Sequence, residues 1–123
     1  MTIKNQVHSK FKVFIPEAAS DGAMRRLVAM VENFTKDGKI AAKSVGIEYI
    51  ENKKQLVLSL GYRDDEPGYP CKLTSVPLGR LNLQPNEIAA AMERAAAGTE
   101  NVICHEFFVD GEGEFVMVLL SHG

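Results

Sequence analysis

The 123-residue chain has 14 basic and 16 acidic side chains, giving a formal net charge of −2 at pH 7. This length suits one domain with its own hydrophobic core and is too short for two ordinary domains, so residues 1–123 are expected to form a single domain, with residues 1–10 poorly ordered. The slightly acidic balance supplies no positive field for attracting polyanions, so we expect no nucleic acid partner.

The sequence also indicates where the protein is located and whether its cysteines are reduced. The N-terminal residues lack a signal-peptide pattern and no apolar run approaches the ~18 residues of a membrane span, so we expect a cytoplasmic protein with no membrane partner. Cys71 and Cys104 belong to no C-x-x-C pair. They are therefore expected to be reduced, structural thiols, with neither a disulfide nor a metal, and no cofactor motif is present.

The first half of the chain begins with a short alternating run, residues 11–15, which predicts an edge strand that Pro16 ends. A helix is expected from Ala23 to Gly38, with Ser20 or Asp21 as a possible N-cap. Its apolar positions follow helical spacing, and we interpret them as core: Met24, Leu27, Val28, Val31 and Phe34.

Residues 44–62 predict a β-hairpin with its turn at Asn52-Lys53. In the expected register, one face is core and pairs Val45, Ile47 and Tyr49 with Leu60, Leu58 and Leu56. The other face is a strip of small residues, Ser44 and Gly46 against Gly61 and Ser59. Because glycine in a strand allows close approach, this strip could receive the protein's own helix, a ligand or a second subunit.

Residues 63–70 predict a turn-containing loop in which Asp64, Asp65 and Glu66 are adjacent. A hard cation could bind three such carboxylates, but calcium sites use alternate positions, and a solvated loop is the favoured interpretation. Residues 71–78 then predict a third strand, with Pro77 placing its end at an edge or a bulge.

The second helix is expected from Gln84 to Gly98, with Pro85 and Glu87 in its first turn. Its many alanines make it thin, so we expect it to cover the small-residue strip of the first hairpin.

Residues 102–120 predict a second β-hairpin around the turn Asp110–Gly113. Pairing Val109 with Glu114 would place Ile103, His105 and Phe107 on one face and Cys104, Glu106 and Phe108 on the other. Both faces are mostly apolar, so the hairpin is expected in the middle of a sheet, with helices on one side and another covering on the other. The candidate interface residues on the second face are Cys104, Phe108, Phe115 and Met117.

The run Cys104-His105-Glu106 contains the residue types of a nucleophile–base pair or a metal site. Neighbouring strand residues point to opposite faces, so Cys104 and His105 are not expected to form a catalytic pair. Glu106 is expected either to form an ion pair with Arg80, Arg94 or another subunit, or to line a sheet-face pocket. The pocket candidates are Glu106, His105, Gly46 and Gly61.

The predicted order is strand, helix, three strands, helix, two strands. It indicates an α+β fold with two helices on a mainly antiparallel sheet of five to six strands. From Met24 onward this order is similar to that of class I type III secretion chaperones, which are small, acidic and dimeric; the resemblance implies a fold and carries no motif. Leu60–Pro70 and Val102–Glu106 also resemble an uncharacterised bacterial family of unknown function.

Two functional hypotheses follow. The first is a non-enzymatic, chaperone-like interaction module that forms a homodimer and can hold a protein partner. It rests on the two apolar faces of the final hairpin, which two short helices are not expected to cover. The second is a small-molecule binder or an enzyme with a pocket around Glu106. No catalytic residue is assigned, because no nucleophile elbow, phosphate loop or pair of catalytic carboxylates is present.

Overall fold

A computed structural model describes residues 9–17, 22–80 and 84–122, and its elements follow the expected order. The chain has an α+β fold with six strands and two helices in this part. The expectation of poor order in residues 1–10 falls mostly on residues 1–8, which lie outside the described residues, whereas Lys10 belongs to the first strand. The elements are β1 (Lys10–Phe14), α1 (Ala23–Thr35), β2 (Ala41–Ile50), β3 (Gln55–Arg63), β4 (Cys71–Arg80), α2 (Pro85–Ala97), β5 (Val102–Val109) and β6 (Glu114–His122).

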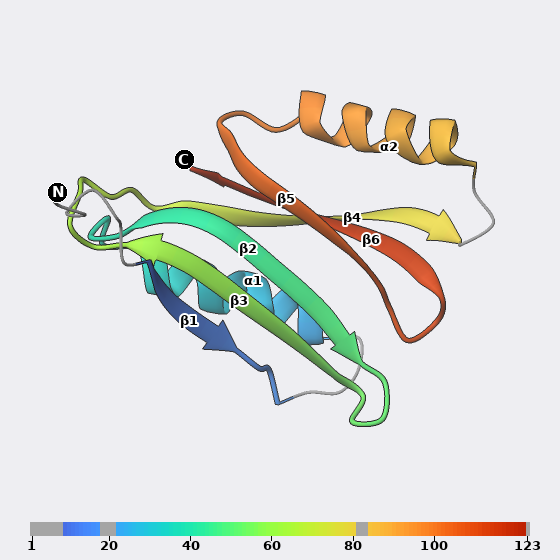
Figure 1. The fold of residues 1–123 in the computed structure, drawn as a ribbon, viewed down its shortest axis with the longest axis horizontal. Helices are drawn as coiled ribbons and strands as arrows, with labels where there is room; N and C mark the ends of the chain where they lie inside the picture. The colour runs from blue at the N-terminus through green and yellow to red at the C-terminus, as the bar shows by residue number, and fades with distance from the viewer. Residues whose placement is uncertain (1–8, 18–21, 81–83, 123) are drawn as a thin grey trace, which may run out of the picture.

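The six strands divide between two three-stranded antiparallel sheets. Sheet A has the order β1-β3-β2 and sheet B has the order β4-β6-β5. Strands β2 and β5 lie side by side and point the same way (Figure 1), but no ladder pairing joins them in the described part of the chain. The sheets are therefore neighbours that are held together by side chains.

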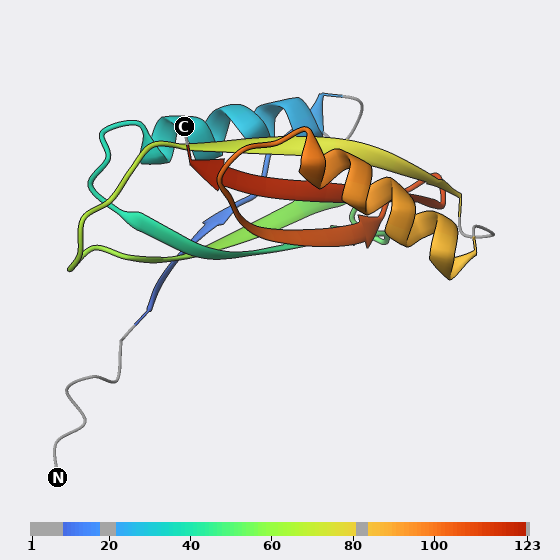
Figure 2. The same ribbon diagram turned by 90° about the horizontal axis from the view of Figure 1, so that it is seen from above.

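Helix α1 packs on the inner side of both sheets (Figure 2). Leu27 and Val31 of this helix are fully buried because its apolar stripe faces β3 and β4. Gly22 occupies the N-cap without a side-chain cap bond, so the expected cap by Ser20 or Asp21 was wrong; those two residues lie outside the described residues. The main core joins α1 to both sheets and includes Phe14, Leu27, Val31, Val45, Ile47, Leu58, Leu60, Leu73, Phe108, Val118 and Leu120.

Helix α2 packs on the opposite face of sheet B from α1 (Figure 2). Its Ile88 and Met92 rest on a small second cluster formed by Leu78, Met117 and Leu119. The expectation that α2 covers the small-residue strip of sheet A was wrong, because α2 follows β4 and meets the apolar face of sheet B. Both faces of sheet B thus carry a helix, whereas in the described residues neither helix covers the outer face of sheet A.

The expected register of the β2–β3 hairpin is confirmed. Val45 pairs with Leu60 and Gly46 with Ser59, so the core face and the small-residue face are as predicted. Strand β4 is an edge strand of sheet B, and its ladder with β6 shifts between Pro77 and Gly79, as the position of the proline indicated.

The expected register of the β5–β6 hairpin was wrong by one residue, since Val109 pairs with Phe115. Asp110 explains the difference. Its Oδ1 accepts hydrogen bonds from the backbone N–H groups of Glu112 at 2.9 Å and Glu114 at 3.0 Å. The Asp110 N–H also donates to the Glu114 carbonyl at 2.9 Å. The loop therefore contains three residues and ends at Gly113, whose φ of 79° is the left-handed conformation such loops require.

The three carboxylates of the β3–β4 loop each meet a cation. Lys10 of β1 contacts Asp64 at 2.6 Å, Arg63 contacts Asp65 at 2.8 Å, and Glu66 pairs with Lys43 of β2 and with Arg63. The hydrogen bond from Arg63 lowers the pKa of Asp65, and the hydrogen bond to Asp64 raises the pKa of Lys10. This run of acids therefore ties together one end of the three strands of sheet A.

Candidate functional site

The four interface candidates do not share a face, because the one-residue register shift turns β6 over relative to β5. Phe108 is 8% exposed and belongs to the main core, against which Cys104 packs. Met117 is 1% exposed within the cluster beneath α2, and Phe115 packs against that cluster. The final hairpin therefore uses most of these side chains inside its own chain.

The pocket candidates are also divided. Gly46 and Glu106 line a shallow pocket of about 330 Å³ between β2 and β5, together with Glu48, Val57 and Ser59. His105 lies on the other face of β5 and is exposed. Gly61 lies two pairs further along sheet A, where the ring of Phe11 covers it; a Cβ there would be 3.4 Å from that ring.

Glu106 forms no ion pair in the described residues. Its Oε1 accepts a hydrogen bond from the backbone N–H of Phe107 at 3.1 Å, and neither Arg80 nor Arg94 reaches it. The expected ion pair with Arg80 or Arg94 was therefore wrong. Among the described residues that line its pocket, the only other charged group is the carboxylate of Glu48. These two carboxylates belong to no group of three or more potential metal ligands within the described residues.

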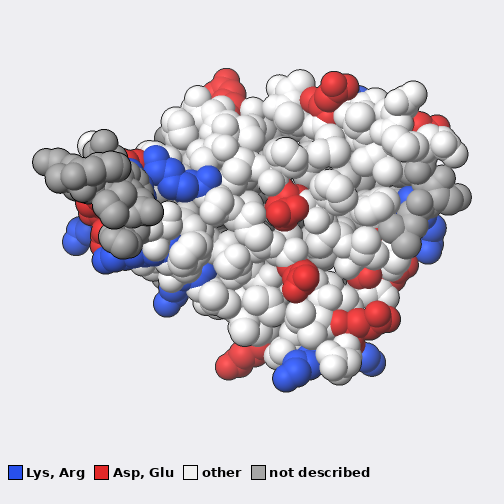
Figure 3. Space-filling view, viewed as in Figure 1, with Lys and Arg blue, Asp and Glu red and all other residues white. Residues whose placement is uncertain are grey.

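The outer face of sheet A carries the most exposed large apolar side chains among the described residues. Phe11 is 68% exposed, Val13 is 53% exposed, and Ile15, just after β1, is 46% exposed. These three side chains form one row along β1, which also has a free outer edge in the described part of the chain. Figure 3, drawn from the same side as Figure 1, shows this face as largely uncharged, with acidic side chains near its middle and basic ones toward its margins.

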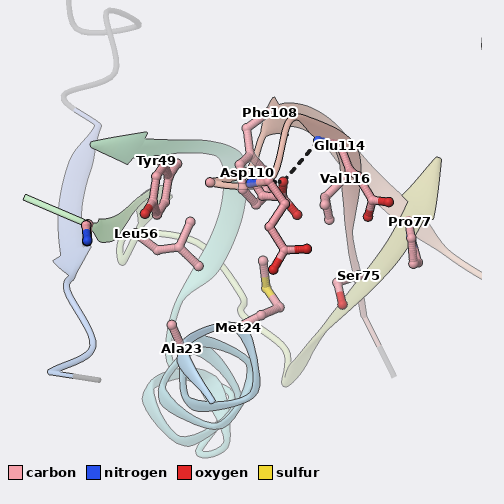
Figure 4. A pocket seen from close by; sticks show the side chains of 13 residues that line it. Ala23, Met24, Tyr49, Leu56, Ser75, Pro77, Phe108, Asp110, Glu114 and Val116 are labelled. Atoms are coloured by element: carbon pink, nitrogen blue, oxygen red, sulfur yellow. Dashed lines mark hydrogen bonds between the residues drawn. The ribbon is translucent and has the colours of Figure 1, made fainter. Parts of the chain in front are cut away.

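A larger cleft of about 600 Å³ opens where the tips of the two hairpins meet the start of α1 (Figure 4). Its apolar wall comes from four elements: Met24 of α1, Leu56 of β3, Phe108 of β5 and Val116 of β6 point toward the same space. Tyr49 of β2 and Ser75 of β4 contribute hydroxyl groups. A volume of this size and a mixed lining are typical of small-ligand pockets, which span ~300–1,000 Å³.

The charged rim of the cleft is mainly acidic. Asp110 and Glu112 line it from the β5–β6 turn and Glu114 from the start of β6. Lys54 from the β2–β3 turn is the one cation among the described residues that line it. Asp110 uses one oxygen to hold the turn, and in the described residues no ion pair joins Glu112 or Glu114 to a basic side chain. The rim can therefore attract positive charge without breaking an existing ion pair.

The sequence pattern singled out Phe108 only as an interface residue, and none of the four predicted pocket residues lines this cleft. Its residues come from six elements and two turns, and no periodicity connects them. One signal was available, since Asp110, Glu112 and Glu114 alternate along the final turn. Three carboxylates within five residues of a tight reversal lie close together, so this turn was a candidate for a concentrated negative charge.

The described residues do not support a metal site or a reactive cysteine. No group of His, Cys, Asp or Glu side chains within the described ranges is arranged to hold a metal ion. Burial raises the pKa of both thiols, more than the hydrogen bond with Thr35 lowers it at Cys71 or that with the Val45 backbone lowers it at Cys104. Neither cysteine is therefore an activated nucleophile. In the part of the chain that the structure describes, neither helix has the length and apolar character needed to cross a membrane.

Comparison with known proteins adds no further constraint: the chain matches no protein-family model, and searches of curated proteins and of solved structures found no match.

Proposed function

We propose that the protein is a non-enzymatic, cytoplasmic interaction module that forms a homodimer through β1, in the manner of small dimeric chaperones. The observation that carries this proposal is the exposed row of Phe11, Val13 and Ile15 beside the free edge of β1. An edge strand with an apolar outer row is a template for pairing with another strand. The final hairpin, which suggested a dimer from sequence, is less suitable because its faces carry α1 and α2.

The apolar residues of β1 are arranged so that the β1 strands of two copies can pair with each other. In an antiparallel pair that places Val13 opposite Val13 of the second copy, Phe11 lies opposite Ile15, and all three outer-row positions face apolar partners. This register also keeps Lys12 away from its own copy, since Lys12 then faces Phe14.

The lysines of β1 do not oppose this pairing. Lys10 is engaged by Asp64 at 2.6 Å, and the Lys12 ammonium lies 5.7 Å from the centre of the Phe34 ring on the α1 side. Both positive charges are therefore held by their own chain, and the outer row remains apolar. Pairing the two copies would join the two A sheets into one continuous six-stranded sheet.

The test is the molar mass in solution, measured by light scattering at tens of micromolar. The wild type is expected to be a dimer, and both Val13→Asp and Val13→Lys are expected to be folded monomers, because either charge would face its copy across the pair. Val13 is 53% exposed, so neither change disturbs the core.

Val102→Asp is the matched control, because Val102 is a strand valine that is 39% exposed in sheet B. It should remain dimeric. A monomeric wild type, or a dimer that survives both substitutions of Val13, would contradict the proposal.

A further inference from the structure

We infer that the cleft between the two hairpin tips binds a small organic cation, an ammonium or guanidinium group carried on an apolar chain or ring. This inference goes beyond the proposed function. The cleft and the edge of β1 have no residue in common. A ligand of this class is defined by two features of the cleft, its apolar wall and its acidic rim.

The wall favours an apolar body. Met24, Leu56, Phe108 and Val116 converge on the space from four different elements (Figure 4), and Phe108 is anchored in the main core. Burying an apolar ring or chain against these side chains removes its surface from water. Because Met24 is unbranched and flexible, its end can adjust to the shape of the body.

The rim favours a positive group. Three carboxylates, those of Asp110, Glu112 and Glu114, face one ammonium, that of Lys54. Arg80 lies opposite Glu114 in the β4–β6 register, yet no ion pair joins them within the described residues. A bound ammonium could therefore donate charge-assisted hydrogen bonds to carboxylates that have no cationic partner among the described residues.

The N-terminus of α1 favours a negative group instead, but this effect is weaker than that of the acidic rim. Ala23 and Met24 line the cleft, and the first turn of α1 has neither an acidic residue nor a side-chain cap. A helix N-terminus is equivalent to about half a positive charge. Glu112 and Glu114, which form no ion pair within the described residues, outweigh this field, and an anionic probe tests that comparison directly.

Three probes with one indole body separate charge from shape: tryptamine is cationic at neutral pH, tryptophol is neutral and indole-3-propionate is anionic. The protein has no tryptophan, so indole fluorescence reports only the probe. We expect tryptamine to bind about tenfold more tightly than tryptophol, and indole-3-propionate to bind more weakly than both.

The double variant Glu112→Gln, Glu114→Gln removes the negative charge of both side chains. It keeps the two backbone N–H groups that donate hydrogen bonds to Asp110, so the turn should be preserved. In this variant tryptamine and tryptophol should bind equally. Glu93→Gln, which changes an exposed carboxylate of α2, is the matched control and should keep the tenfold preference.

Methionine methyl resonances locate the probe. Tryptamine should shift the Met24 methyl signal and leave those of Met92 and Met117, which lie at the α2 cluster, unchanged.

The inference is overturned if none of the probes binds, if tryptamine and tryptophol bind the wild type equally, or if the double variant keeps the preference. A shift at Met117 without one at Met24 would also overturn it. If a blocked phenylalanyl-lysine peptide binds about tenfold more tightly than tryptamine, the inference of a small-molecule ligand is also overturned. The natural ligand of the cleft would then be a protein segment.

Discussion

Gly111 and Tyr49 make direct contact across the two sheets: a Cβ on Gly111 would lie 2.8 Å from the Tyr49 Oη and 2.9 Å from its Cζ. The tip of the β5–β6 hairpin therefore rests on a side chain of β2, and this contact closes one side of the cleft. A residue without a side chain at this position lets the two hairpin tips meet while the space between Met24 and Val116 stays open.

The two glycines of this turn should respond differently to substitution. Gly111→Ala should displace the Tyr49 ring and weaken tryptamine binding severalfold, with a small loss of stability because the ring is partly exposed and can move. Gly113 has a φ of 79° and free space around it, so Gly113→Ala should cost about 1 kcal/mol through backbone strain. Asn tolerates the left-handed conformation, so Gly113→Asn should recover most of that loss, whereas Gly111→Asn should not recover binding. Equal behaviour of the two positions in urea unfolding and probe titration would contradict this account.

Thr35 should be the polar residue whose loss costs most stability. Its buried Oγ1 donates to the Val31 carbonyl at 3.0 Å and accepts from the Cys71 N–H at 3.0 Å, which links the end of α1 to the start of β4. Thr35→Val keeps the shape and leaves the Cys71 N–H without its acceptor, so the free energy of unfolding should fall by about 1–3 kcal/mol. Thr35→Ser should retain more stability than Thr35→Val does. As the control, Thr74→Val at an exposed position of β4 should leave the free energy of unfolding, measured with urea, almost unchanged. If Thr74→Val lowers it as much as Thr35→Val does, the hydrogen bonds of Thr35 are not the cause of the loss.

Glu106→Gln should leave the protein as stable as the wild type or slightly more stable at neutral pH. The carboxylates of Glu106 and Glu48 line the same shallow pocket, so neutralising one removes a repulsion. The gain should be no more than about 0.5 kcal/mol, because both groups are in contact with solvent. Glu48→Gln should produce a similar gain, and the double variant should gain less than the sum. A clear loss of stability in Glu106→Gln would indicate a cationic partner, such as one from a second subunit.

The two thiols should make the protein less stable in alkali. Burial raises the pKa of Cys71 and Cys104 in the folded state. Their contribution to stability is fully present below the pKa of the unfolded thiols, ~8.5, and is lost as the pH rises through the folded pKa values. The urea midpoint should therefore fall between pH ~8 and pH ~10, and Cys104→Ala should show a smaller fall over the same interval. An unchanged pH dependence in Cys104→Ala would contradict the assigned cause.

Short-range patterns were enough to predict the elements, their order and the α+β class, because helix and strand periodicities are local properties of the sequence. They also predicted the register of the β2–β3 hairpin, whose alternation of Val45, Ile47 and Tyr49 with small residues allows only one buried face. The β5–β6 hairpin is apolar on both faces, so alternation could not fix its register. The hydrogen bonds accepted by Asp110 fixed it instead.

Tertiary structure alone decided which surfaces remain open. The sequence could not indicate that α2 packs on sheet B, since an alanine-rich stripe is compatible with either sheet, and this choice left the outer face of sheet A exposed. It could not indicate the cleft either, because Met24, Tyr49 and Val116 come from three elements that meet only when the two sheets pack side by side. Local patterns determine which side chains share one face of a helix or strand, whereas the positions of separate elements relative to one another determine which faces are buried and which side chains come together at a site.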